Sequence, residues 1–149
     1  MNSKGAAIAR EEFHEKSQLH EISIRDSDGA AWRTIYRQTT PLPAIGLVGV
    51  SADEKSLFVI DARESEFLSL HSMSMADGTI SPPLMQRSNA DVAGVISDIN
   101  RVVHGVRYSG MFPSYDMFDE AVEADIRGVQ NALQGSAVYL DYWSSDWSK

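Results

Sequence analysis

The sequence predicts an α+β fold: a single domain whose mainly antiparallel, five- to six-stranded sheet is covered on one face by two C-terminal helices, with a short N-terminal helix. Three observations lead to this prediction. Two apolar runs, Ala44–Val50 and Leu57–Ala62, flank a polar tetrapeptide, as in a buried hairpin. The clearest helical spacing of apolar residues begins after Asn89. A length of 149 residues suits one domain with its own hydrophobic core.

The N-terminal part predicts a tail, a helix and a hairpin. Residues 1–5 hold no anchoring side chain and are expected to form a flexible tail. Ala6–Gln18 is weakly amphipathic and predicts the short helix. Leu19–Arg25 and Trp32–Arg37 alternate in polarity across the turn signal Ser27–Gly29, which predicts two antiparallel strands.

The stretch Ala44–Ala62 is predicted to form the central hairpin, and Glu66–Met75 a third strand beside it. Gly46 and Gly49 weaken the first strand, and mark a bulge or the close approach of another backbone. The segment VSADEKSLFVIDA resembles one blade of a β-propeller. Because no period of 20–50 residues recurs and one blade cannot close a propeller, the sequence does not predict that fold.

The C-terminal part predicts two helices and a last strand. The first helix, residues 89–104, has its apolar side chains at helical spacing: Val92, Val95, Ile96, Ile99, Val102 and Val103. The second, residues 115–134, has an inward stripe of Phe118, Val122, Ile126, Val129 and Leu133. Ala137–Trp143 alternates as a final strand, so the predicted domain spans residues 6–143 and residues 144–149 form a C-terminal tail.

Composition restricts the function more than any motif does. The sequence contains no cysteine, which fits a reducing compartment, and no stretch approaches the ~18 apolar residues of a membrane span, so we expect a cytoplasmic protein. The formal charge is −8, and residues 108–149 contain seven acidic residues against two basic ones. This balance disfavours direct binding of nucleic acid and suits a basic partner.

The acidic C-terminal segment supplies the candidate binding surface. Acidic residues at spacings of three and four would form one stripe on the second helix, and the last strand and tail would extend it with further acids and two tryptophans. The predicted partner-binding residues are Asp116, Asp119, Glu120, Glu123, Asp141, Trp143, Asp146 and Trp147. A purely structural interpretation is that the acids stabilise a helix N-terminus, Trp143 packs in the core and Trp147 covers an edge.

Candidate catalytic and metal-binding groups are few. His14 and His20 are six residues apart, whereas two ligands on one helix face need a spacing of four. His71 could form a Ser-His-Asp group with Ser69 or Ser72 and Asp61, but no nucleophile motif marks either serine. The sequence therefore predicts no catalytic residue, no metal site and no cofactor.

Two functions from different classes follow. The first is a non-enzymatic acidic inhibitor that docks on a basic protein, such as a nuclease toxin or a nucleic-acid-binding machine, as immunity proteins and phage inhibitors do. The alternative is a small-molecule-binding domain or minor enzyme, with a pocket between sheet and helices lined by Met73, Met75, Met111, Phe112 and Tyr115. A homodimer that pairs through Trp32 and Tyr36 is a third possibility.

Overall fold

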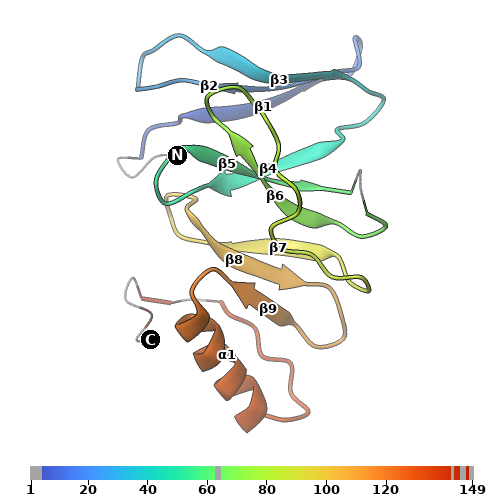
Figure 1. Cartoon of the computed structure of the whole chain (residues 1–149), viewed down its shortest axis with the longest axis vertical. Helices are drawn as coiled ribbons and strands as arrows, with labels where there is room; N and C mark the ends of the chain where they lie inside the picture. The colour runs from blue at the N-terminus through green and yellow to red at the C-terminus, as the bar shows by residue number, and fades with distance from the viewer. Residues whose placement is uncertain (1–4, 63–64, 142, 145–146, 148–149) are drawn as a thin grey trace.

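The protein is mostly β-sheet. The computed structural model describes residues 5–62, 65–141, 143–144 and 147. These residues form three separate three-stranded antiparallel sheets and one C-terminal helix, arranged one after another in chain order along the long axis of the molecule (Figure 1). The predicted single sheet under two helices is therefore wrong.

The first sheet contains β1 (Ala9–His14), β2 (Leu19–Ile24) and β3 (Arg33–Thr39). The predicted hairpin of β2 and β3 is confirmed, with a register shift after Ile22. The predicted helix over Ala6–Gln18 is wrong, because β1 pairs with β2 along its whole length. Periodicity over so short a segment is a weak signal, and pairing with the neighbouring strand outweighs it.

The second sheet contains β4 (Ile45–Val50), β5 (Ser56–Asp61) and β6 (Ser69–Ser74). The predicted hairpin and the third strand beside it are both confirmed, but they form a three-stranded sheet of their own, with β4 at its edge, and are not the centre of a larger sheet. Gly49 lies at a register shift, and a Cβ there would come within 2.6 Å of the Arg101 carbonyl oxygen. The glycine therefore marks both a bulge and a close approach of another backbone.

The third sheet contains β7 (Val92–Ser97), β8 (Val103–Tyr108) and β9 (Ser114–Met117). The predicted helix over residues 89–104 is wrong, because this segment folds into the β7–β8 hairpin. The Asp98 carboxylate accepts hydrogen bonds from the backbone N–H groups of Asn100 and Val102 and so fixes the turn. The apolar side chains at helical spacing are all Val or Ile, which favour strands.

The helix α1 (Glu120–Ala132) is shorter than predicted, because residues 114–117 belong to β9. Asp119 caps its N-terminus, and Val122 is its buried residue, whereas Val129 and Leu133 are about half exposed. The predicted strand over Ala137–Trp143 is wrong for the described residues of that segment, which form no strand. Within the described part of the chain, no helix has the length and apolar character needed to cross a membrane.

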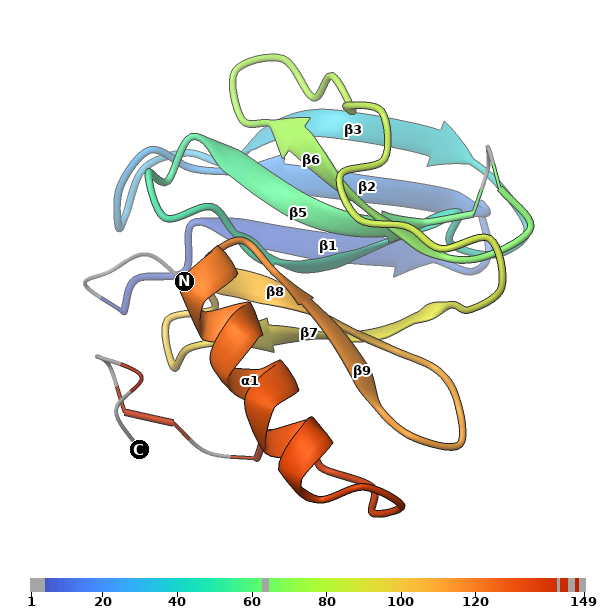
Figure 2. The same cartoon turned by 60° about the horizontal axis from the view of Figure 1, so that its bottom comes forward.

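The core is divided among the interfaces between successive layers. Ile22, Leu57 and Val59 belong to a cluster between the first and second sheets, and Phe58 and Leu70 to one between the second and third. A third cluster lies between the third sheet and α1, which crosses that sheet in Figure 2. β5 is thus buried on both faces, as predicted, but sheets cover it where helices were expected.

The meander repeats although the sequence does not. Each sheet pairs consecutive strands in the order of the chain and packs against the next sheet. A β-propeller blade has four strands and is arranged radially around a central channel, whereas each of these sheets has three strands. The segment VSADEKSLFVIDA spans the turn between β4 and β5 within the second of these meanders.

Candidate functional site

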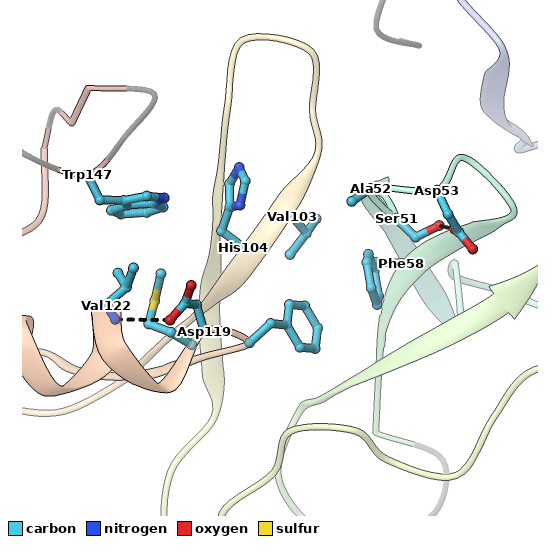
Figure 3. A pocket seen from close by; sticks show the side chains of 11 residues that line it. Ser51, Ala52, Asp53, Phe58, Val103, His104, Asp119, Val122 and Trp147 are labelled. Atoms are coloured by element: carbon cyan, nitrogen blue, oxygen red, sulfur yellow. Dashed lines mark hydrogen bonds between the residues drawn. The ribbon is translucent and has the colours of Figure 1, made fainter.

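A hollow of about 410 Å³ lies where the turn between β4 and β5 faces β8 and the start of α1. We call it the aromatic hollow, and it is lined by Ser51, Ala52, Asp53, Phe58, Val103, His104, Met117, Phe118, Asp119, Val122 and Trp147. In Figure 3, His104 and Asp119 lie between Trp147 on one side and Ala52 and Phe58 on the other. Residues from the middle of the chain and from its C-terminal part therefore meet at one place.

The walls of the aromatic hollow are apolar. Phe58 of β5 stacks on Phe118, with ring centroids 5.4 Å apart and an interplanar angle of 27°. Phe58 is buried, whereas Phe118, which lies between β9 and the helix cap Asp119, is 47% exposed. Val103, Met117 and Val122 also line the hollow and are buried. The hollow thus has a largely apolar lining and one half-exposed aromatic ring.

Its ionisable groups are two aspartates and one histidine. Oδ1 of Asp119 accepts hydrogen bonds from the backbone N–H groups of Ala121 (2.8 Å) and Val122 (3.3 Å). The hydrogen bond from the Ser51 hydroxyl, and next that from the backbone N–H of Lys55, lowers the pKa of Asp53. None of the described residues that line this hollow is Lys or Arg. The hollow therefore suits a positively charged group.

The two tryptophans pack on the third core cluster beside the aromatic hollow. Their rings stack nearly parallel, with centroids 5.2 Å apart, and Trp147 meets His104 edge-on at 5.5 Å. Trp143 and Trp147 also contact the cluster of Tyr115 and Val122. Trp147 lines the hollow from residues that were expected to form a free tail.

The remaining predicted acidic residues do not form one stripe. Asp116 lies on β9 and pairs with Arg87 at 2.8 Å, so it is not on the helix with the others. Glu123 accepts a hydrogen bond from the Met117 backbone N–H and pairs with Arg127. Glu120 and Asp141 are exposed, and Asp146 lies outside the described residues.

Asp116 instead organises a polar cluster within the third sheet. It accepts a hydrogen bond from the Tyr108 hydroxyl at 2.7 Å, and the Arg87 guanidinium lies 3.9 Å from the centroid of the Tyr108 ring. Burial, reinforced by the Asp116 carboxylate, strongly raises the pKa of Tyr108. This carboxylate thus contributes to internal structure.

The candidate Ser-His-Asp group is a buried hydrogen-bonded pair. Nδ1 of His71 is 2.9 Å from the Ser81 carbonyl oxygen, which can only accept, so Nδ1 donates. Nε2 of His71 lies 2.9 Å from the Ser69 hydroxyl, and that hydroxyl faces the backbone carbonyl of Asp61. Ser69 is 1% exposed, so its hydroxyl is not accessible to a substrate.

The histidines of the N-terminal part lie apart from each other and bind carboxylates. Nε2 of His20 is buried and lies 2.8 Å from Glu11, whose other carboxylate oxygen accepts a hydrogen bond from the Leu47 backbone N–H. His14 lies 3.7 Å from Glu21 on the more exposed side of the sheet. The described residues contain no cluster of three or more groups that could hold a metal.

The residues expected to line the alternative pocket or a dimer face are dispersed. Met73 is fully buried between the first two sheets, whereas Met111 is 86% exposed and Phe112 is 51% exposed. Trp32 lies under the guanidinium groups of Arg10 and Arg25, at 4.6 and 4.9 Å from its ring centroid. Tyr36 packs against the core on the other side of the first sheet.

Sequence reasoning missed Phe58, His104 and Phe118 as members of one site. In the sequence each fits an ordinary structural role: Phe58 lies in a buried run, His104 ends the predicted helix over residues 89–104 that the structure does not form, and Phe118 belongs to the predicted inward stripe. Their convergence depends on the packing of the third sheet against the second, which no local pattern records. Comparisons of this chain with protein-family models, with curated proteins and with solved structures found no match.

Proposed function

We propose that the protein is a non-enzymatic acidic binding protein that docks on a basic protein partner and receives one cationic side chain of that partner in the aromatic hollow. The single observation that supports this is the lining: aromatic and aliphatic walls with Asp53, Asp119 and one histidine, His104, and no Lys or Arg among the described lining groups. A Lys or Arg side chain has an apolar stem and a charged head, so it complements such a surface.

The proposed docking surface differs from the predicted acidic stripe. Asp116 and Glu123 are engaged by Arg87 and Arg127, so their charges are partly neutralised within the molecule. Asp119 and the exposed Glu120 lie at the start of α1 beside the hollow. Asp119 compensates the positive end of the helix dipole, which would otherwise repel a cation there. The formal charge of −8 favours rapid, salt-sensitive association with a basic partner.

The class of partner follows from the same charge balance. A nuclease toxin or a nucleic-acid-binding machine presents a basic face to phosphate, and an acidic protein can cover that face. In this proposal the protein blocks such a partner in the cytoplasm. Its cysteine-free sequence is compatible with a reducing compartment.

The experiment compares a cationic ligand with its neutral isostere. N-acetylarginine amide and N-acetylcitrulline amide have nearly the same shape, but only the first is charged. Two-dimensional amide NMR should show the arginine compound shifting resonances of Ala52, Val103 and Val122, which line the hollow. The citrulline compound should bind more weakly. Equal shifts by both compounds, or shifts that map elsewhere, would remove the proposal.

Asp119→Asn is the matched variant for this titration. Asparagine keeps a side-chain oxygen that can cap the helix, so the fold is expected to persist without the charge. Affinity for the arginine compound should fall about 3- to 5-fold, the size expected for one exposed charge interaction. Asp125→Asn, an exposed change further along α1, is the control and should leave affinity unchanged.

A small apolar ligand is the second candidate, because the hollow of about 410 Å³ falls within the range of small-molecule sites. Phe118, Val103 and Val122 would then provide the binding energy without any charge. In the same NMR experiment, binding of a neutral aromatic such as indole that is unaffected by Asp119→Asn would favour this candidate.

A further inference from the structure

A second hollow, of about 560 Å³, lies at the interface between the first two sheets. We call it the basic hollow. It is bounded by the loop after β2, by the turn between β4 and β5, and by the end of β6. Its apolar lining comes from Ile8, Ile24 and Met75, of which Ile8 and Ile24 are 4% and 2% exposed. The aromatic hollow lies at a different interface, between the second and third sheets.

Two cations of the basic hollow form no salt bridge with a carboxylate among the described residues. Arg33 donates from Nη1 to the Ala76 carbonyl oxygen at 3.0 Å and from Nη2 to that of Met75 at 2.8 Å. Both acceptors are neutral, so the guanidinium is held in place while its charge is not cancelled. Lys55 likewise makes no salt bridge within the described part of the chain, although its charge contributes to the lowered pKa of the exposed Asp53. The charge of Arg33 therefore remains available to an anion, and that of Lys55 is offset only in part, by Asp53.

The guanidinium of Arg33 also keeps hydrogen-bonding capacity. An arginine side chain has five N–H donors, and the two carbonyl contacts use two of them. Arg25 lines the same hollow but is already engaged by Asp28 at 2.6 Å and by the Ala7 carbonyl. The anion would therefore be held by Arg33 and Lys55.

The rest of the lining restricts the charge of the ligand. Asp26 and Glu54 also line the basic hollow, so its lining is only weakly positive although the whole protein has a formal charge of −8. A dianionic phosphate would be repelled by these carboxylates more strongly than a monoanion. A carboxylate matches the fork of a guanidinium, and the buried isoleucines favour an apolar group attached to it.

We infer that the basic hollow binds a carboxylate with a short apolar tail, its oxygens on Arg33 and Lys55 and its tail on Ile8, Ile24 and Met75. This site is separate from the proposed docking function and stands whether or not the aromatic hollow binds a cation. The chemical class includes short aliphatic acids and the C-terminal residue of an apolar peptide.

Hexanoate and hexan-1-ol are the probes, because they share a tail and differ in charge. Amide NMR titrations on the whole protein should show hexanoate shifting resonances of Ser56, Ser74 and Ala76, which line the hollow. Hexan-1-ol should bind more weakly there. Equal affinity of the two probes, or hexanoate shifts confined to other regions, would overturn the inference.

Lys55→Gln and Asp26→Asn test the charges that line the basic hollow, and we expect them to change the affinity for hexanoate in opposite directions. Lys55 and Asp26 are both exposed, so neither change should unfold the protein. Lys55→Gln should weaken hexanoate binding about 2- to 5-fold, and Asp26→Asn should tighten it by a similar factor. Lys16→Gln, in the turn at the opposite end of the first sheet, is the control and should change nothing. An unchanged affinity in Lys55→Gln would also overturn the inference.

Discussion

At the scale of single residues, Gly49 decides how closely the second and third sheets approach. A Cβ at this position would lie 2.5 Å from Cγ2 of Val103 and 2.6 Å from the Arg101 carbonyl oxygen. The backbone N–H of Val50 donates to that same carbonyl at 2.9 Å, so these two backbone segments cannot separate without losing a hydrogen bond. The absence of a side chain is therefore a condition of this interface.

We predict that Gly49→Ala destabilises the protein by about 1–3 kcal/mol, the usual cost of overpacking. Gly46→Ala is the control on the same strand, because a Cβ there has no neighbour within 4 Å. Chemical denaturation of both variants checks this. A Gly49→Ala variant as stable as Gly46→Ala would contradict the close approach.

Tyr108 is the residue from which we expect alkaline sensitivity. Its pKa is raised by burial and by Asp116, so the folded state holds a proton that the unfolded state releases near pH 10. The stabilisation is complete below the unfolded pKa and is lost as pH rises above it. Stability should therefore fall above about pH 10 in the native protein and fall less steeply in Tyr108→Phe. Denaturation curves from pH 8 to 11 measure this, and identical slopes would show that Tyr108 is not responsible.

At the scale of elements, the strands of the first two sheets were predictable except β1, which was expected to be a helix, and the third sheet was not. β2, β3 and the strands of the second sheet alternate in polarity or form short apolar runs between clear turn signals. In residues 92–103 the valines and isoleucines coincide with helical spacing, although Ile99 is at the tip of a turn and 87% exposed. The β-branched composition and the Asp98–Asn100 turn were the signals that favoured a hairpin.

The site was predictable only in part, for a related reason. Asp119 and Trp147 were expected at a binding surface, and the structure places both beside the aromatic hollow. Their partners Phe58 and His104 reach it through the stacking of sheets, which depends on contacts distant in sequence. Asp116 was assigned to the same stripe because the helix was expected to begin at residue 115, which lies within β9.

The effect of Arg101→Gly on stability distinguishes the hairpin from the predicted helix, because the two structures predict changes of opposite sign. Its φ of 66° lies in the left-handed region, which glycine adopts without strain. Arg101→Gly should therefore leave stability unchanged or raise it by about 0.5–1 kcal/mol. In a helix interior the same change would cost about 1 kcal/mol. Thermal denaturation reports the sign, and a clear loss of stability would contradict the turn.

At the scale of the whole molecule, the layers are held together by specific links between sheets. The Glu11 carboxylate joins the first two sheets, since it contacts His20 of β2 and the Leu47 backbone N–H of β4. Val50 and Val102 form a bridge between the second and third sheets. Because each sheet contacts mainly its neighbours, we expect the loss of one of these contacts to open the interface that it spans before the other interfaces open.

Glu11→Ala tests this expectation. It leaves the buried His20 ring and the Leu47 N–H without their partner, so it should cost about 1–3 kcal/mol. Hydrogen exchange should quicken first in β1 and β2, while β7 and β8 keep their protection. Glu12→Ala removes a carboxylate that pairs with Arg10 at the surface and should have little effect. Uniform loss of protection in all three sheets would show that the molecule opens as a single unit.

The central claim is that residues 92–108 form a sheet that packs on the second sheet and so builds the aromatic hollow. Backbone nuclear Overhauser effects over this segment test it most directly. The structure predicts a cross-sheet contact between Val50 and Val102 and slow exchange of the Val50 amide, which donates to Arg101. A continuous series of helical contacts between residues three apart over 89–104 would contradict the fold and the hollow that depends on it.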